Sequence, residues 1–300
     1  MITKEKEVSL QNESVGSLAK VKAYYELLKF RLSALVAFSG AFGYSLAVDK
    51  IDWWKITLIS LGGFLITGAA NIVNQIKEKE LDKLMKRTQN RPLPTGRLST
   101  KEALIFCIIL FLIANYILIF EFNLKSGLLG ILSFFLYGFA YTPLKRVGPI
   151  SVFVGAIPGA FPPMIGWVAA TNHFGLEPGI LFAIQFFWQF PHFWAIAWVA
   201  DDDYQRAGFK MLPNNGHKDI RTALTMMIYT IFLVPCGFIP HFLGMTGFNS
   251  AIIAVLCGVL FLSQTFYLMS KTTDKAALMM MFGSFIYLPI VEIAFLMDKI

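Results

Sequence analysis

The chain has 300 residues, of which 56% are hydrophobic and only 15% charged, and its mean hydropathy is +0.61. A soluble domain carries about 25% charged residues, so this composition excludes an ordinary soluble protein and indicates an all-α, polytopic membrane protein. A net charge of +7 could indicate a nucleic-acid binder, so the positions of the basic residues along the chain have to be considered. The three cysteines stand singly in apolar segments and form no metal-binding spacing.

The first residues differ in composition from the rest of the chain. Residues 1–22 mix Lys, Glu, Ser and Asn, which is typical of a disordered or loosely held tail. The apolar run that follows could be a signal peptide, but eight more such runs come after it, so we interpret it as the first membrane span. We therefore predict a cytoplasmic tail over residues 1–24 and a membrane domain over residues 25–300.

Nine apolar segments have the length needed to cross a membrane. A hydrocarbon core of about 30 Å requires about 20 residues of helix. The predicted spans are residues 32–48, 53–74, 103–120, 126–142, 150–170, 178–199, 222–242, 249–270 and 277–297. This pattern predicts a helix bundle embedded in the bilayer.

The basic residues divide unequally between the two ends of these spans. If the N-terminus is inside, 22 of the 26 Lys and Arg lie in the tail, the inner loops and their flanks. Positive charge favours the cytoplasmic side of a membrane protein, so we predict a cytoplasmic N-terminus, and the basic charge needs no nucleic acid to explain it. The two long inner loops, residues 75–101 and 200–221, hold most of the unusual polar chemistry, which places the function at the cytoplasmic face.

The second span leads into "NIVNQIKEKELDKLMKRTQNRPLPTGR", residues 71–97. If the helix continues into this loop, Asn74, Glu78 and Asp82 lie along one stripe, because residues four apart on a helix share a face. Glu80 falls near the opposite side. One amide and two carboxylates supply the oxygen ligands that Mg²⁺ takes when it also bridges phosphate oxygens. The alternative interpretation is a solvated helix end that neighbouring lysines neutralise.

The same loop continues with three arginines, Arg87, Arg91 and Arg97. Pro92 and Pro94 force extended backbone between them. Arginine forks bind phosphate oxygens bidentately, and a Mg²⁺–diphosphate between the acids and the arginines gives every charge a partner. No glycine-rich nucleotide-binding pattern follows a strand here, so a diphosphate ester is favoured over a nucleotide.

Two further polar elements are predicted at the same face. The sixth span ends in "WVADDDYQRAGFKMLP", where Asp201, Asp202 and Asp203 stand about 100° apart if helical, so at most two face one pocket. This cluster is either a solvated helix end or a second set of Mg²⁺ ligands. Lys145 and Arg146 follow the fourth span and add positive charge. Together the three loops describe a site for a diphosphate whose tail lies in the membrane.

These segments resemble the UbiA superfamily of intramembrane prenyltransferases, and within it the heme-farnesylating branch. The resemblance covers about residues 25–295, and its most specific parts are "DKLMKRTQNRPLPTGR", "YTPLKRVGPISVFVGAIPGAFPPMIGW", "FFWQFPHFWAIAW" and "DDDYQRAGFKMLP". The superfamily's first motif, N-x-x-x-D-x-x-x-D, reads here as Asn74, Glu78 and Asp82. The second motif, D-x-x-x-D, is missing after the sixth span, where Asp203 fits the heme-farnesylating pattern best.

The resemblance implies nine helices around a central cavity that opens to the lipid and is capped on the cytoplasmic side of the inner membrane. It implies Mg²⁺ as the cofactor and a reaction that joins the farnesyl group of farnesyl diphosphate to a vinyl group of heme b, with water added, giving heme O and diphosphate. The predicted catalytic residues are Asn74, Glu78, Asp82 and Asp203, and these with Asp202 are the predicted metal ligands. Heme A synthase or terminal oxidase assembly is the implied partner.

Substrate binding is predicted for cationic and aromatic residues of several segments. The predicted set is Arg87, Arg91, Arg97, Lys145, Arg146, His192 and Tyr141. His192 lies within the sixth span beside Pro191, and ionisable residues inside a membrane are functional by default. Three roles stay open for it: ligation of heme iron, contact with a propionate, or a hydrogen bond within the bundle.

Two spans contain residues that interrupt or join helices. Pro158, Pro162 and Pro163 predict either a break or a kink in the fifth span. Gln185 and Gln189, four residues apart on the sixth span, are consistent with hydrogen bonds between helices.

Two other functions stay open from the sequence. A prenyltransferase could act instead on an aromatic acceptor such as 4-hydroxybenzoate or a chlorophyllide, because residue spacing does not identify the acceptor. A membrane transporter is an alternative of another class, but transporters tend to have repeat-related broken helices with charges near the midplane. Here the charges crowd one face and no internal repeat is apparent.

Overall fold

The computed structural model describes residues 18–300. In that part of the chain, nine helical stretches are long and apolar enough to cross a membrane. Each overlaps one predicted span, and no boundary differs from its prediction by more than three residues. The predicted all-α, nine-span architecture is therefore confirmed.

The spans consist of single helices or of helical pieces in line. The single helices are α2 (Phe30–Ala47), α3 (Trp53–Lys77), α8 (Ile150–Thr171), α9 (Leu176–Val199), α14 (Phe248–Lys271) and α15 (Asp274–Met297). The composite spans are α5 (Thr100–Tyr116) with η1 (Ile117–Phe122), α6 (Leu124–Phe135) with η2 (Leu136–Tyr141) and α7 (Thr142–Leu144), and α11 (Ile220–Ile231) with α12 (Leu233–Cys236) and α13 (Ile239–Phe242). The short helices outside the spans are α4 (Lys79–Asp82), α10 (Asp201–Arg206) and η3 (Asn214–Gly216).

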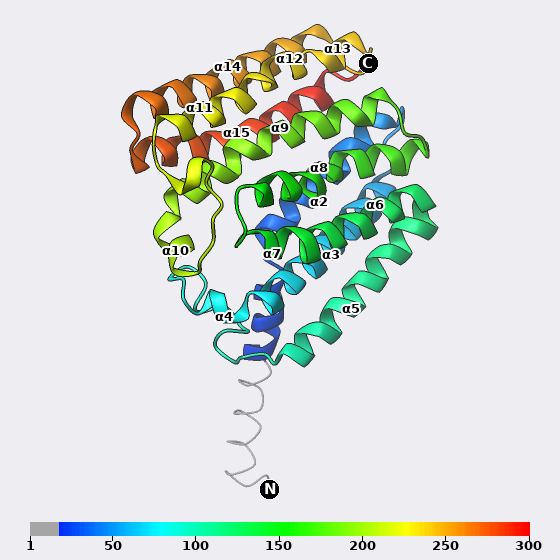
Figure 1. Cartoon of the computed structure of the whole chain (residues 1–300). Coiled ribbons are helices and arrows are strands. Elements are labelled where there is room, and N and C mark those ends of the chain that lie inside the picture. Colours follow the sequence, from blue (N-terminus) through cyan, green and yellow to red (C-terminus); the bar gives the residue numbers. More distant parts are fainter. Residues whose placement is uncertain (1–17) are drawn as a thin grey trace, which may run out of the picture.

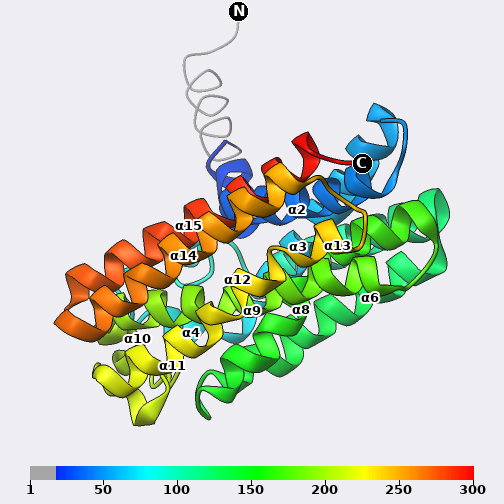
Figure 2. The same ribbon diagram turned by 90° about the horizontal axis from the view of Figure 1, so that it is seen from above.

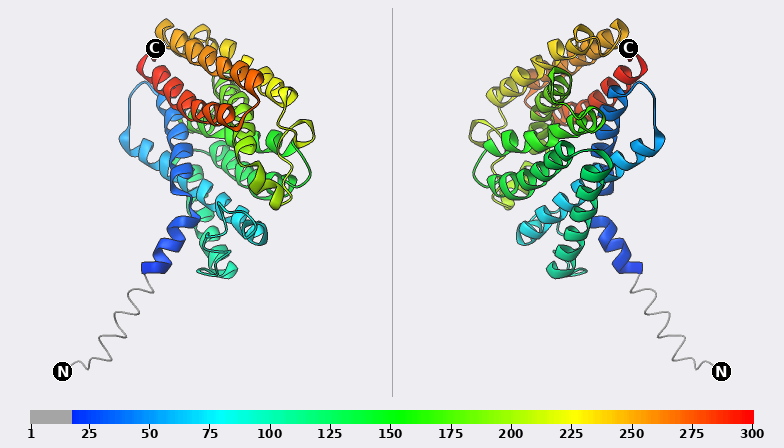
Figure 3. Two further views of the ribbon diagram at one scale, coloured as in Figure 1. Left: turned by 90° about the vertical axis from the view of Figure 1, so that its left-hand side faces the viewer. Right: turned by 90° about the vertical axis from the view of Figure 1, so that its right-hand side faces the viewer.

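The helices pack as a closed bundle. α2 packs on α3 and α8, α9 packs on α8 and α15, and α14 packs on α15. The first and last spans, α2 and α15, also contact each other. Figure 2 shows α14 and α15 running side by side, and Figure 3 shows that α3 and α5 (cyan to teal) lie on the opposite side of the molecule from α14 (orange). The membrane domain is therefore one continuous bundle.

Glycines bring α2 and α8 unusually close together. A Cβ atom added to Gly166 would lie 2.0 Å from the carbonyl oxygen of Gly40, and one added to Gly43 would lie 2.0 Å from that of Pro163. No van der Waals contact is that short, so only glycine permits this separation of the two backbones.

α8 passes through its three prolines as one helix, so the predicted break is excluded. Pro163 has no N–H with which to bond the Gly159 carbonyl one turn earlier. Gln185 Nε2 donates to that carbonyl at 2.8 Å, and Gln189 Nε2 donates to Ala156 O at 3.0 Å. A neighbouring helix thus satisfies the freed backbone group, which is how membrane helices tolerate proline. Both glutamines join α9 to α8.

Part of the predicted tail is helical. Residues 18–27 form a helix, so the boundary predicted after residue 24 falls inside it. Lys20 pairs with Glu102 at 2.6 Å, and Glu26 pairs with Arg97 at 2.6 Å, so this helix is attached to the loop after α4 and to the start of α5. The first 17 residues of the predicted tail lie outside the described residues.

Candidate active site

The helical path of α3 continues beyond its last residue and positions the predicted stripe. The Glu78 N–H donates to Asn74 O at 2.9 Å and the Asp82 N–H donates to Glu78 O at 2.7 Å, so the turn is maintained into α4. Asn74, Glu78 and Asp82 are buried, whereas Glu80 is exposed and pairs with Lys83. The three oxygen-bearing side chains therefore have the predicted arrangement, with Glu80 directed elsewhere.

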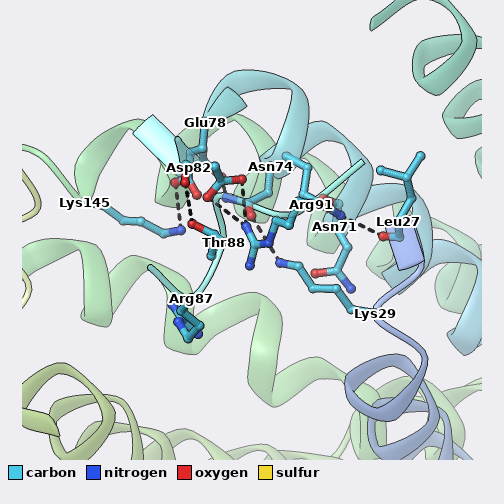
Figure 4. Close-up of polar contacts among 12 residues, drawn as sticks. Leu27, Lys29, Asn71, Asn74, Glu78, Asp82, Arg87, Thr88, Arg91 and Lys145 are labelled. Atoms are coloured by element: carbon cyan, nitrogen blue, oxygen red, sulfur yellow. Dashed lines mark hydrogen bonds and ion pairs between the residues drawn. The ribbon is translucent and has the colours of Figure 1, made fainter. Parts of the chain in front are cut away.

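Each acid of the stripe is paired with a cation. Lys145 Nζ donates to Glu78 Oε1 at 2.8 Å, and Arg91 Nη1 donates to the two carboxylate oxygens of Asp82 at 2.9 and 2.8 Å. Figure 4 shows both cations directed at the stripe. The lysines of the helix end that the alternative interpretation offered as partners are not the ones used. Removing one member of such a buried pair leaves the other charge uncompensated.

A third cation, which the sequence analysis missed, reaches the stripe from the other direction. Lys29 Nζ donates to Asn74 Oδ1 at 3.3 Å (Figure 4). Lys29 directly precedes α2 and has a φ of 48°, so the chain turns sharply there. Burial, together with the nearby charges of Arg91 and Lys145, lowers the pKa of Lys29 well below that of an ordinary lysine. A lysine before a membrane span is common, so its sequence position gave no signal.

Lys145 is surrounded by aromatic rings as well as by Glu78. Its Nζ lies 4.8 Å from the ring centroid of Tyr141 and 5.4 Å from that of Phe209. Burial would lower the pKa of Lys145, but the Glu78 carboxylate outweighs burial and raises it. Lys145 therefore stays protonated at neutral pH. Tyr141, the last residue of the π-helical turn η2, is buried beside it, as expected for a member of the site.

Asp203 forms hydrogen bonds to the loop that follows α4. Its carboxylate accepts hydrogen bonds from the Lys86 N–H at 3.1 Å and the Arg87 N–H at 3.2 Å, and it pairs with Arg206. Burial would raise the pKa of Asp203, but these hydrogen bonds outweigh burial and lower it. The Arg87 guanidinium lies over the ring of Tyr204 at 5.8 Å. In this structure the Asp203 oxygens are thus occupied by the loop.

Three other predicted residues are not brought to the stripe. Arg97 forms a bidentate pair with Glu26, at 3.0 and 2.6 Å, and so ties the loop to the helix over residues 18–27. Asp202 and Arg146 are exposed, and the described part of the chain offers their side chains no hydrogen-bond or ion-pair partner. The sequence placed these residues in loops at the same end of the bundle but could not give the directions of their side chains.

The three polar loops meet at one end of the bundle, as the count of spans predicted. Asp203, after the sixth span, bonds to Lys86 and Arg87, after the second. The Lys210 N–H donates to Lys145 O at 2.7 Å, which joins the loop after the fourth span. Figure 1 shows α4 and α10 near each other at this end and the C-terminus at the opposite end.

The oxygen atoms of the stripe suit a hard divalent cation. Asn74, Glu78 and Asp82 supply one amide and two carboxylate groups, which are ligands that Mg²⁺ prefers. Among residues 18–300, no three His, Cys, Asp or Glu side chains gather into a metal site of their own. With one amide and two carboxylates, the stripe fits a cation that completes its ligand shell with oxygens from a bound ligand, as Mg²⁺ does with phosphates.

His192 lies in α9 where that helix packs on α15. Its Nδ1 is 2.8 Å from Ser284 Oγ, and its ring stacks on Trp188 with the centroids 4.4 Å apart. Two aromatic contacts connect it with the charged residues: the rings of His192 and Phe193 are 5.4 Å apart, and those of Phe193 and Tyr141 are 6.3 Å apart. The His192 side chain therefore lies at the contact of α9 with α15, and its neighbour Phe193 is the residue that contacts Tyr141.

A groove of about 1060 Å³ follows α2 along the side of the bundle. It begins at Phe30, next to Lys29, and extends to Val48 and Lys299 at the far end. Most of its lining is apolar, and Phe30 and Leu61 are exposed, so the groove opens toward the membrane. An apolar groove of this kind can accept a hydrocarbon chain.

The chain is similar to known proteins of the UbiA prenyltransferase family. Residues 36–287 match the UbiA prenyltransferase family. The protoheme IX farnesyltransferase of Cytophaga hutchinsonii is 54% identical over 94% of this chain and 99% of its own length. The protoheme IX farnesyltransferase of Flavobacterium johnsoniae is 46% identical over 92% of this chain and 94% of its own length.

Solved structures share the fold at low sequence identity. Digeranylgeranylglyceryl phosphate synthase superposes with a TM-score of 0.78 at 21% identity, covering 93% of this chain and 98% of its own. A UbiA homolog from Archaeoglobus fulgidus, solved with GPP and Mg²⁺ bound, superposes with a TM-score of 0.63 at 15% identity, covering 91% of this chain and 99% of its own. The bundle described above is therefore the fold of these membrane proteins.

Proposed function

The chain belongs to the UbiA prenyltransferase family, and on this premise we propose that it is a protoheme IX farnesyltransferase. It transfers the farnesyl group of farnesyl diphosphate to a vinyl group of heme b, with addition of water, and releases heme O and diphosphate. The observation that carries this proposal is the buried cluster of cations and oxygen ligands at one end of the bundle.

The charges of this cluster favour an anionic ligand. Lys29, Arg91 and Lys145 converge on the stripe, which contributes the two carboxylates of Glu78 and Asp82. Lys29 bonds only to an amide oxygen there, and no carboxylate partner for it is present within residues 18–300. The lowered pKa of Lys29 shows that its charged form lacks compensation here, and a bound diphosphate would supply the negative charge that stabilises it.

The cations and the stripe would have different roles in binding farnesyl diphosphate and in breaking its C–O bond. Arg91 and Lys145, now held by the acids, turn to the diphosphate oxygens and stabilise the negative charge that grows as the allylic C–O bond breaks. Asn74, Glu78 and Asp82 would hold Mg²⁺, which supplies further stabilisation of the leaving diphosphate when it is bound. The Glu78 carboxylate raises the pKa of Lys145, so Lys145 is protonated at neutral pH when the diphosphate arrives.

The aromatic residues next to the charged cluster suit the allylic cation that results. Tyr141 is buried, and its ring centroid lies 5.1 Å from that of Tyr137 and 6.3 Å from that of Phe193. Ring faces stabilise cations, and a dry site prevents early capture by water. The apolar groove that begins beside Lys29 is where we place the farnesyl tail.

We propose that the polar end of the bundle faces the cytoplasm and that the membrane is the inner membrane. The excess of Lys and Arg in the loops at this end is the support for that orientation. Residues 25–300 would act as one membrane domain, and the product would pass within the membrane to heme A synthase or terminal oxidase assembly.

The rival functions lack comparable support. The most similar relatives given above act on protoheme IX by name, which favours heme over 4-hydroxybenzoate as the acceptor. A transporter would be expected to carry charged residues near the midplane, whereas the charged cluster lies at the end of the bundle.

The proposal is tested by a chromatogram of the hemes extracted from membranes of a bacterial host that cannot make heme O. The wild-type chain should produce heme O, and added farnesyl diphosphate should increase it. Lys145→Ala should abolish the product, whereas Lys275→Ala, which removes an exposed lysine, should not. If the folded wild-type protein produces no heme O, the proposed function is wrong.

A further inference from the structure

Ser284 determines which ring nitrogen of His192 carries the proton. Ser284 Oγ lies 2.6 Å from Met281 O and 2.8 Å from His192 Nδ1. A hydroxyl has one proton to donate and a carbonyl can only accept, so Ser284 donates to Met281. Its oxygen then accepts from the Nδ1–H of His192, and in the neutral ring Nε2 carries the lone pair. The tautomer is assigned from this hydrogen-bond pattern.

The orientation of the His192 ring is fixed on several sides. It stacks on Trp188 with an angle of 20° between the ring planes, and Trp188 Nε1 itself donates to Ser284 O at 2.8 Å. The edges of Phe193 and Phe285 lie against it, with centroids at 5.4 and 5.2 Å. The Nε2 lone pair therefore has a defined direction.

Nε2 itself has no hydrogen-bond partner within residues 18–300, and the His192 side chain is half-buried. An imidazole inside a membrane span that served only to join α9 to α15 would leave this nitrogen desolvated at a cost. One nitrogen that donates to a fixed acceptor and a second that is free is the arrangement of a metal-ligating histidine.

We propose that Nε2 of His192 is an axial ligand to the iron of the porphyrin acceptor, with Ser284 and Trp188 as positioning residues. This inference rests on the proposed function, because the heme acceptor supplies the iron. His192 lies seven residues before the end of α9, or about 10 Å along the helix. The rings of Phe193 and Tyr141 lie between it and Lys145, so an acceptor held at His192 would lie on the side of the bundle where we place the farnesyl cation.

Two porphyrin probes separate ligation of iron from packing against the ring. Purified full-length protein in lipid nanodiscs is titrated with ferric protoporphyrin IX and with metal-free protoporphyrin IX. The variants are His192→Ala, Ser284→Ala and, as a matched control, His241→Ala, whose Nδ1 lies 3.1 Å from Thr246 O in another part of the chain. Absorption and electron paramagnetic resonance spectra report the axial ligand.

The wild type should show a histidine-ligated ferric spectrum. His192→Ala should lose it, recover it with added imidazole, and bind ferric protoporphyrin more than about tenfold more weakly while binding the metal-free probe unchanged. Ser284→Ala should weaken ferric binding about 10- to 100-fold, and His241→Ala should behave as wild type. Equal losses for both probes in His192→Ala, or an unchanged ferric spectrum, would overturn the proposal.

Heme O production by the same wild-type preparation separates this proposal from the proposed function. If the wild type makes heme O but His192→Ala keeps the histidine-ligated spectrum, only the ligand assignment is wrong. If the wild type neither binds ferric protoporphyrin nor makes heme O, both proposals are wrong.

Discussion

Asp82 is the residue on which the charged cluster depends most. It is fully buried, its carboxylate binds Arg91 through both oxygens, and its backbone carbonyl accepts from Thr88 Oγ1 at 2.9 Å. These contacts give Asp82 a structural role in addition to the catalytic role that we propose for it, so the effect of a substitution there needs two measurements.

We predict that Asp82→Asn lowers heme O formation by about 100-fold or more, because a bound metal supplies several kcal/mol to the transition state. It should also lower the free energy of unfolding by roughly 1–3 kcal/mol, since Arg91 loses its counterion but stays partly exposed. Glu80→Gln is the matched control, because Glu80 is an exposed acid of the same loop. Product formation and thermal unfolding are measured for both variants. An equal loss of activity in Glu80→Gln would contradict the assignment of the stripe.

Asp203 offers a second prediction at this scale, with a defined pH dependence. Its pKa is lowered in the folded protein, so it stabilises the loop at pH values above its unfolded pKa of about 3.9 and loses this effect as the pH falls through the lowered value. At neutral pH the Lys86 and Arg87 amides should exchange hydrogen faster in Asp203→Asn than in wild type. The difference in thermal stability between the two proteins should be constant near neutral pH and should vanish in acid. Unchanged amide exchange would mean that Asp203 does not hold the loop.

The sequence predicted the stripe because residues four apart on one helix must share a face. It could not predict the partners, because Lys29 and Lys145 are 45 and 67 residues from the side chains that they contact. Nothing local marks such a pair, and only the packing of α3 against its neighbours brings the residues together.

At the scale of the elements, the backbones of α2 and α8 come so close that glycine is required at their contact. The backbones meet where Gly40 and Gly166 face each other, so this contact has no space for a side chain. Membrane helices associate largely through packing of this kind, and we expect the stability of the bundle to depend on it.

We predict that Gly166→Ala destabilises the protein by roughly 1–3 kcal/mol or more, because its methyl group would force two backbones apart. Gly179→Ala, also in a helix, meets nothing within 4 Å and should be neutral or slightly stabilising. Thermal unfolding of the purified variants in one detergent tests both. Equal melting temperatures for the two variants would show that the α2–α8 contact can relax.

Helix positions followed from hydropathy alone, since a bilayer requires long apolar segments whatever their neighbours are. The effect of the prolines in α8 did not follow from the sequence in the same way. Pro163 frees a carbonyl group, and the outcome depends on Gln185 of another helix, which keeps α8 intact. Whether a proline breaks a helix therefore depends on contacts with other helices, which cannot be read from the sequence of that helix alone.

For the whole molecule, the loops after the second, fourth and sixth spans lie at one end of the bundle. Only this arrangement allows them to form a common site. The number of crossings between the second and sixth spans is even, and the contacts of Asp203 with Lys86 and Arg87 agree with it. The side of the membrane on which this end lies is a prediction from the distribution of basic residues.

We predict that Thr95→Cys and Asn215→Cys, in a background without the three native cysteines, both resist a membrane-impermeant thiol reagent in intact cells. Both residues are exposed at the polar end of the bundle. Asn172→Cys, exposed at the opposite end, should react. Labelling after the cells are opened confirms that each cysteine is accessible. Reaction of Thr95→Cys and Asn215→Cys in intact cells would place the site on the outer side.

The most direct test of the central claim uses purified protein in lipid nanodiscs with farnesyl diphosphate, heme b and Mg²⁺, and measures heme O and diphosphate together. We predict that the two products appear in equal amounts, that EDTA prevents both, and that 4-hydroxybenzoate in place of heme b gives no prenylated product. Prenylation of 4-hydroxybenzoate with heme b left unchanged, or heme O formation at the wild-type rate by Asp82→Asn, would contradict the proposed function of the charged cluster.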